Sequence, residues 1–167
     1  MKIRRLLLLL VAFSCLARPV PLAAAAAVHT VQVEATITSS AQWLPVGDEE
    51  GHVIGLAKGE GQAVLSSGET AKYANVSTFD SRRGQGGFSE GYTRFTFADG
   101  SEIFFYWTAR ISAGQNGLST SSGEGVIVKG SGRFAGIEGT SAFTSRVELR
   151  DAQRVTVATA TLTYTLP

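Results

Sequence analysis

The sequence predicts an all-β protein: an eight-stranded antiparallel β-barrel behind a cleaved N-terminal signal peptide. Apolar and polar residues alternate over many short runs, which is the pattern of a strand with one buried face. Gly, Asp, Asn and Ser separate these runs at short intervals, as the turns of an all-β chain require. The connections are also too short for the crossover of a dozen or more residues that parallel strands need, so neighbouring strands should pair antiparallel.

Residues 1–27 have the composition of a signal peptide. Three basic residues precede an unbroken apolar run at 6–13, and small residues at 23–27 offer cleavage sites. The apolar run is shorter than the about 20 residues of a membrane-spanning helix. We expect cleavage near Ala25 or Ala27, no membrane span, and a secreted or periplasmic protein. Lipidation at Cys15 is the alternative, ranked lower because the two residues preceding Ser14 fit a lipoprotein cleavage site poorly.

The remaining chain, 28–167, reads as a single β-barrel domain. Removing the leader takes four of the 15 basic residues and none of the 14 acidic ones, which leaves a net charge of −3. Nucleic acids and anionic membranes bind clustered positive charge, so this balance argues against both as partners. Cys15 is the only cysteine, so the mature domain has no disulfide and must be stabilised by its own core.

Alternation and turn residues place the strands in order. Val31, Val33, Ala35 and Ile37 should face inward from the first strand, and Trp43-Leu44-Pro45 should form the connector after it. Further strands are expected at 52–58, 62–65, 71–79, 92–97, 102–111, 124–129, 143–149 and 154–166, with a turn or bulge at 59–61 and a flexible loop at 81–87. These runs amount to eight or nine strands. Eight strands closed into a barrel leave no unpaired edge, and a two-sheet sandwich is the alternative.

The hairpin around Asp99-Gly100 is the clearest in the chain. A three-residue loop, 98–100, groups the apolar side chains on one face and leaves the charged ones on the other. We prefer this register because burying a lone Arg or Glu is costly. The inward face then carries Phe95, Phe97, Ile103, Phe105 and Trp107. Tyr92, Phe104 and Tyr106 fall on the outer face, where exposed aromatics indicate a covering element or a subunit interface.

A glycine-punctuated stretch follows the strand at 124–129. Glycines at 130, 132, 136 and 139 should supply left-handed backbone, with Phe134 and Ile137 as the large apolar groups among them. We predict a structural turn (Gly130, Gly132, Phe134, Gly136, Gly139) that tucks Phe134 against the end of the barrel. A phosphate-binding loop is disfavoured, because the spacing is not G-x-G-x-x-G and an alternating run follows instead of a helix.

The same stretch carries a family resemblance. Residues 130–140, with the terminal Thr163-Tyr164-Thr165-Leu166-Pro167, resemble the allene oxide cyclase-like barrel proteins, and plant dirigent proteins carry a similar G-x-G-x-F/Y-x-G-x-x-G turn. The hairpin at 92–101 resembles small exported bacterial members of this group. The resemblance covers most of 30–167. It implies a calycin-type barrel with a central cavity, often a homotrimer. Allene oxide cyclases use a pocket with Glu, Asn and Cys, and no catalytic position here matches residue by residue.

The sequence offers aromatic residues for a ligand in the barrel lumen. Trp43, Tyr73, Phe79, Phe95, Phe105 and Trp107 are the candidates for lining a cavity that holds a small hydrophobic or aromatic molecule. Core filling is the competing interpretation, since large side chains usually complete small barrels. Cavity volume discriminates the two: several hundred cubic ångströms would favour a ligand-binding protein or a cofactor-free isomerase or cyclase, and a filled interior would favour a structural or interaction protein.

Acid–base chemistry has few candidates. A hydrolase would need His52 within reach of a Ser and a carboxylate, and no nucleophile-elbow sequence is present. Two histidines without mature cysteines argue against a zinc site, and no cofactor or metal is expected. Glu34, Glu102 and Glu148 should lie on outer faces. For Asp80, at a strand end, the barrel mouth is an alternative, and exposure is the favoured interpretation for all four. Asn75-Val76-Ser77 matches a glycosylation sequon.

Overall fold

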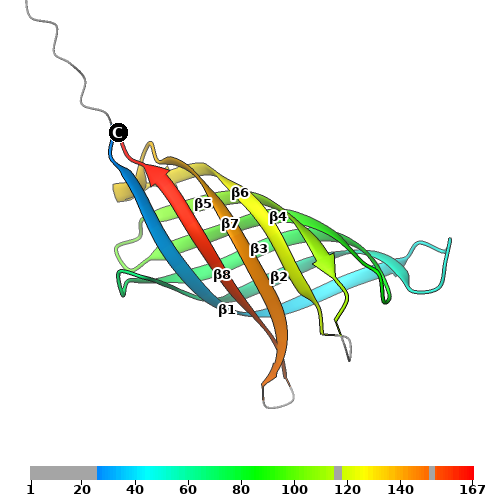
Figure 1. Cartoon of the computed structure of the whole chain (residues 1–167). Coiled ribbons are helices and arrows are strands. Elements are labelled where there is room, and N and C mark those ends of the chain that lie inside the picture. The colour runs from blue at the N-terminus through cyan, green and yellow to red at the C-terminus, as the bar shows by residue number, and fades with distance from the viewer. Residues whose placement is uncertain (1–25, 115–117, 151–152) are drawn as a thin grey trace, which may run out of the picture.

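A closed eight-stranded antiparallel barrel makes up the described part of the chain (Figure 1). The computed structural model describes residues 26–114, 118–150 and 153–167. Each strand pairs with the next in sequence, and β8 returns to pair with β1, which confirms the predicted fold class and excludes a sandwich. The strands are β1 (Val28–Pro45), β2 (His52–Leu65), β3 (Thr70–Arg82), β4 (Gly86–Phe97), β5 (Glu102–Ser112), β6 (Thr120–Ser131), β7 (Glu138–Arg150) and β8 (Gln153–Thr165).

The register of the strands sets the width of the barrel. Following the paired residues once around the wall from Gln32, through all the other strands, returns to β1 at Gln42, which is 42 − 32 = 10 residues further along. Strand number, stagger and diameter are linked in a closed sheet. Because this stagger of ten residues exceeds the strand number of eight, the strands tilt more and the interior is wider than in an eight-strand barrel staggered by eight.

The core lies in the half of the barrel nearest the two ends of the described chain. Val33, Ala35 and Ile37 of β1 are buried, as predicted, and they face the aromatic residues of β4 and β5. The turns at 66–69, 98–101 and 132–137 close this end, which we call the closed end. At the opposite, open end, β1 continues eight residues past its last pair with β8 at Ile37, and the β7–β8 hairpin diverges from it (Figure 1).

Two sequence expectations at the open end are wrong. Trp43-Leu44-Pro45 is no connector: it is the last part of β1, and Trp43 pairs with Gly55. Residues 59–61 make no turn or bulge, because β2 runs unbroken from His52 to Leu65. Its glycines serve close contact instead, since a Cβ at Gly61 would lie 1.9 Å from the carbonyl oxygen of Thr36. Likewise, β3 and β4 extend into the expected loop at 81–87, so the turn is confined to 83–85.

The β4–β5 hairpin has the predicted three-residue loop. Phe95 pairs with Ile103, and the amide of Phe97 donates a hydrogen bond of 2.9 Å to the carbonyl of Ser101. Gly100 adopts the positive φ of 81° that such a loop requires. The predicted inward and outward faces follow from this register: Phe95, Phe97, Ile103 and Phe105 are buried, and Tyr92 is exposed.

The glycine stretch closes the barrel with a 3₁₀ turn, η2 (Gly132–Phe134). Gly132 and Gly136 have positive φ, as expected, but Gly130 and Gly139 do not. These two are needed for a different reason. A Cβ at Gly130 would lie 2.0 Å from the carbonyl oxygen of Phe134, and one at Gly139 would lie 2.2 Å from that of Thr163. Close backbone approach therefore fixes glycine at 130 and 139.

Phe134 fills the closed end, as predicted. Its side chain is 6 % exposed, and its ring centroid lies 4.9 Å from that of Phe97. Arg133 covers both rings from outside, 4.9 Å and 4.7 Å from their centroids, and pairs with Glu69 and Asp99. Arg133 therefore links the turns at 66–69, 98–101 and 132–137 above the packed rings of Phe97 and Phe134, which together form the aromatic plug of the closed end.

Residues 1–25, which include Cys15 and most of the signal peptide predicted at 1–27, lie outside the described residues, as do 115–117 and 151–152. Within the described ranges there is no helix of the length and apolarity needed to cross a membrane.

Candidate functional site

An internal cavity of about 170 Å³ lies in the lumen. Residues of seven strands contribute to its wall, and all of them point inward by the alternation of their strands. Small side chains on β7 and β8 leave the space, because Ser141, Ser145, Ala158 and Ala160 face the bulky residues of β4 and β5 across it. At this level the lumen is therefore not completely filled, and the space is smaller than the several hundred cubic ångströms of a typical ligand pocket.

Aromatic rings form one side of the cavity. Phe95 and Phe105 meet edge to face with centroids 5.0 Å apart, and Tyr73 lies 5.9 Å from Phe95. Trp107 meets Phe143 edge to face at 5.7 Å. The two edge-to-face pairs have the geometry that the quadrupoles of aromatic rings favour. The wall therefore presents ring faces and edges to the lumen in a fixed geometry.

A small polar cluster interrupts this aromatic wall. Thr93, 6 % exposed, accepts a hydrogen bond of 3.0 Å from the indole Nε1 of Trp107, and its hydroxyl lies 3.4 Å from that of Tyr73. Burial raises the pKa of the Tyr73 hydroxyl, so this group stays protonated at neutral pH. Asn75 lies beside Thr93 in the ladder and also lines the cavity. Its buried Oδ1 has no hydrogen-bond partner among the described residues.

The structure brings four of the six proposed lumen residues to the cavity: Tyr73, Phe95, Phe105 and Trp107. Trp43 and Phe79 line the wider hollow at the open end instead. Trp43 is 61 % exposed on the open-end extension of β1, and Phe79 lies over Gly55 nearby. The position of each aromatic along the barrel axis depends on the strand register, which the sequence does not show.

Sequence reasoning missed Phe143 and Asn75 as cavity residues. Phe143 begins the alternating strand expected at 143–149, and that alternation was a usable signal of its inward face. Asn75 was considered only as a glycosylation sequon, yet the alternation that makes Tyr73 inward makes Asn75 inward too. Because its Oδ1 is buried in the lumen, the amide is inaccessible to a glycosylating enzyme in the folded protein.

A larger hollow of about 1320 Å³ lies at the open end of the lumen. Each of the eight strands contributes one inward residue and its two neighbours to the lining, as in Gln42 to Leu44 of β1 and Thr78 to Asp80 of β3. A surface that runs around a closed barrel at one level can only be its inner surface. This hollow shares Ser89, Phe143 and Ala160 with the smaller cavity, so it is the wide, open continuation of the same lumen.

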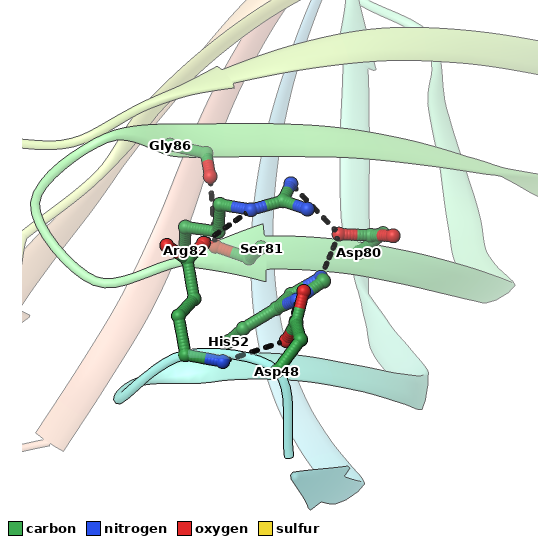
Figure 2. A network of polar contacts seen from close by, with 7 residues as sticks. Asp48, His52, Asp80, Ser81, Arg82 and Gly86 are labelled. Atoms are coloured by element: carbon green, nitrogen blue, oxygen red, sulfur yellow. Dashed lines mark hydrogen bonds and ion pairs between the residues drawn. The ribbon is translucent and has the colours of Figure 1, made fainter. Parts of the chain in front are cut away.

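The second candidate site is a charged network at the open end (Figure 2). His52, 5 % exposed, bonds through Nδ1 to Asp48 at 2.6 Å and through Nε2 to Asp80 at 2.9 Å. Arg82 pairs with Glu49 at 2.5 Å and with Asp80 at 3.6 Å. Asp80 is exposed on the outer face, next to inward-facing Phe79, as the favoured interpretation of the sequence had it, and it does not point into the barrel mouth.

This network does not have the geometry of a hydrolase. Hydrogen bonds to Asp48 and, second, to Asp80 raise the pKa of His52, and the bond to His52 lowers the pKa of Asp48. An imidazolium that donates both N–H groups has no lone pair left to accept a proton. The neighbouring Ser81 hydroxyl donates to the carbonyl of Gly86 instead, and none of the described serines bonds to His52. His52 thus acts as a clamp between the 46–51 turn and β3.

Asp48, Glu49 and His52 place three potential metal-ligand atoms within 4.8 Å of one another. Both His52 nitrogens and the Glu49 carboxylate already have partners, and Arg82 brings a positive charge into the cluster. A metal would have to displace these bonds, so the donor set fits an ion-pair network better than a metal centre. The carboxylates expected on outer faces are there: Glu102 bonds to Thr96, and Glu148 to Arg146 and Arg150.

The chain matches no protein-family model, and no curated protein sequence shows significant similarity to it. The fold is common to proteins of many functions, so function has to be argued from the site itself.

Proposed function

We propose that the protein binds a small apolar molecule, about the size of a single aromatic ring, in the barrel lumen. The observation that carries the proposal is the 170 Å³ cavity, lined by inward-facing side chains that include Tyr73, Phe95, Phe105 and Trp107. Pockets for drug-sized ligands occupy about 300–1,000 Å³, whereas an apolar cavity of about 150 Å³ accepts benzene. A single ring therefore matches this aromatic-lined part of the lumen, and the hollow at the open end gives access to it.

Binding is better supported than catalysis. Tyr73 is the only titratable side chain among the described residues that line the cavity, and burial raises its pKa. A cofactor-free isomerase or cyclase, the function that the resemblance to allene oxide cyclase-like proteins implies, would have to act here mainly by fixing its substrate and excluding water. The lumen offers that environment without a second acid or base.

Calorimetric titration with toluene tests the proposal. We expect toluene to bind the wild-type protein, and Ala158→Leu to abolish binding because the added side chain projects into the cavity. Thr159→Leu is the matched control, since the adjacent residue on β8 points outward. Toluene binding that survives Ala158→Leu, or that is absent from the wild type, would overturn the lumen as the site.

We also propose that the protein is exported and assembles as a homotrimer. A row of outward side chains crosses four strands, Val76, Tyr92, Tyr106 and Val126, and three of these, Val76, Tyr92 and Val126, are among the exposed large hydrophobic residues. The Tyr92 and Tyr106 rings lie 5.3 Å apart within it. Sedimentation equilibrium of the wild type and Tyr92→Glu tests assembly: a monomeric wild type contradicts it. Such a surface would also serve the alternative function, a structural or interaction protein.

A further inference from the structure

We infer that the free edge of β1 at the open end binds an extended peptide segment of another protein, which adds to the barrel wall as a strand antiparallel to β1. This inference goes beyond the proposed function. It depends neither on lumen binding nor on the outward row of side chains proposed for trimer assembly, which lies on β3 to β6.

Residues 38–45 of β1 have a strand neighbour on one side only. Their pairing with β2 continues to Pro45, whereas the pairing of β1 with β8 ends at Ile37. All of 38–45 are exposed, and the β7–β8 hairpin diverges from them (Figure 1). Proteins protect free edges with charged side chains, bulges or proline, and this edge has only Pro45 at its end. The rest of the edge is therefore open to strand addition.

The hydrogen bonds of the β1–β2 ladder show which backbone groups the edge offers. The N–H of Val46 bonds to the carbonyl of His52 at one end of the ladder, and the N–H of Ser66 bonds to the carbonyl of Gln32 at the other. Opposite residues therefore exchange bonds at even-numbered positions of β1, and the register between these ends is unbroken. The odd-numbered residues direct their N–H and C=O groups away from β2.

Three odd-numbered residues beyond Ile37 carry an N–H: Ser39, Ala41 and Trp43. Among the described residues, no backbone hydrogen bond reaches them from the β8 side. An antiparallel strand laid along this edge would both donate to and accept from each of the three. The side chains of Ser39 and Ala41 are small and face the lumen side, so the added strand has room for larger apolar side chains opposite them.

A single extended segment fits this edge better than the strands of this protein do. If β8 continued its own register along β1 it would reach no further than Ser40, because β8 begins at Gln153. In a symmetric pair of two β1 edges centred on Ala41, Pro45 of the second copy would fall opposite Ile37, where β8 already lies. The occupant is therefore one strand wide and comes from another protein.

Charges at the two ends of the edge give the segment a direction. Beyond Pro45, the turn at 46–51 carries three acidic residues and no basic one. At the other end, residues 146–154 of the β7–β8 hairpin carry three arginines and two acidic residues. An antiparallel segment places its N-terminal end at the acidic turn and its C-terminal end at the hairpin. Complementary charge therefore calls for basic residues before the paired stretch and acidic residues after it.

The probe for this inference is a fluorescein-labelled peptide, Lys-Lys-Ala-Thr-Val-Thr-Val-Thr-Glu-Glu, whose valines would lie opposite Ala41 and Ser39. N-methylation of both valines removes N–H groups that face β1. N-methylation of the threonine before each valine removes N–H groups that face away, and is the matched control. Fluorescence anisotropy should show that methylating the valines weakens binding about tenfold or more, as expected for lost hydrogen bonds, and that methylating the threonines does not.

The protein side of the test uses Ala41→Pro. This substitution removes an N–H from the free edge and none from the β2 ladder, so it should abolish peptide binding, whereas Ala41→Ser keeps the N–H and should bind like the wild type. Should Ala41→Pro not fold, the methylated peptides still decide.

Three results would overturn the inference. One is a wild-type protein that does not bind the probe, and another is equal weakening by the two methylated peptides. The third is a dimer, found by sedimentation in the absence of peptide, that Ala41→Pro converts to a monomer, because the edge would then pair with a second copy. A peptide with its lysines and glutamates exchanged should bind more weakly, and equal binding would contradict the direction assigned to the segment.

Discussion

The contacts of individual residues decide between competing chemical interpretations of this protein. The sequence allows His52 to be either an ordinary strand-end histidine or the general base of a hydrolase. A general base needs one ring nitrogen free to accept a proton. Instead, Asp48 and Asp80 accept from both nitrogens, which favours the imidazolium and makes His52 a clamp. In the lumen, Asn75 presents the opposite case, a buried group with an unused hydrogen-bonding atom.

The His52 clamp should make stability depend on pH. Its pKa is raised above the usual 6.5, so its contribution is fully present below about pH 6.5 and is lost as the pH rises through the raised value. The pKa of Asp48 is lowered below 3.8, so its contribution is lost only as the pH falls through that lowered value. Thermal unfolding should therefore show the wild type losing more stability between pH 6 and pH 9 than His52→Gln does, with Ser81→Ala behaving like wild type. Parallel pH profiles of wild type and His52→Gln would contradict this.

Sequence patterns predicted whether a residue faces the lumen or the outside, but not its position along the barrel axis. Alternation placed Phe95, Phe105 and Trp107 inward correctly, because the three-residue loop was fixed by keeping Arg94 and Glu102 outside. It did not separate Phe79 from Tyr73, although both face inward, because only the register shows that one lies toward the open end. The place of Asn75 in the cavity wall was missed for a related reason, because the surroundings of a polar residue on an inward face are known only from the register.

At the scale of elements, the glycine stretch forms the turn that covers the closed end of the barrel. It was predictable as a reversal that buries Phe134, because four glycines and one aromatic leave few alternatives. The separate roles of the glycines were not predictable, since positive φ and close approach both select glycine. The same ambiguity made 59–61 look like a turn, although Gly59 and Gly61 are close-contact positions in a continuous strand.

Phe134→Ala should destabilise the barrel by about 3–5 kcal/mol, the usual cost of emptying a buried phenylalanine site. Phe134 packs on Phe97, and Arg133 would lose one of the two rings it covers. Phe88→Ala is the control, because Phe88 is 55 % exposed on the outer wall, and it should cost less than about 1 kcal/mol. Urea unfolding measures both free energies, and equal values would show that Phe134 is not the plug of the closed end.

Gly130→Ala should cost more than about 2 kcal/mol, because the new Cβ meets the backbone carbonyl of Phe134 and the turn must shift. Gly84→Ala makes the comparison: Gly84 has a φ of 75° with open space around it, so only the left-handed strain of about 1 kcal/mol applies. If the two substitutions have the same effect on the urea midpoint, close approach is not what selects glycine at 130.

The molecule as a whole is defined by its closure and stagger. Ten residues of stagger over eight strands give an interior that the aromatic side chains of β4 and β5 fill only in part, because β7 and β8 contribute Ser and Ala at the facing positions. Closure was predictable from the short connections and alternation. The residual volume was not, since it is the difference between the width set by the register and the side chains that point inward.

The proposed export also belongs to the scale of the whole chain. If the leader is removed as its composition predicts, the mature protein should begin near Ala26 or Val28, at the start of β1. Intact-mass measurement of protein recovered from the medium or periplasm should show this truncation and no lipid on Cys15. A full-length or lipid-modified mass would contradict simple secretion.

The claim on which the account depends is that a single apolar ring occupies the lumen. A crystal structure of the protein soaked with bromobenzene tests it most directly, because bromine can be located by its anomalous signal. The account predicts one bromine site enclosed by Phe95, Phe105 and Trp107. Bromine found only on the outer wall, or a lumen closed by side chains with no bromine inside it, would contradict it.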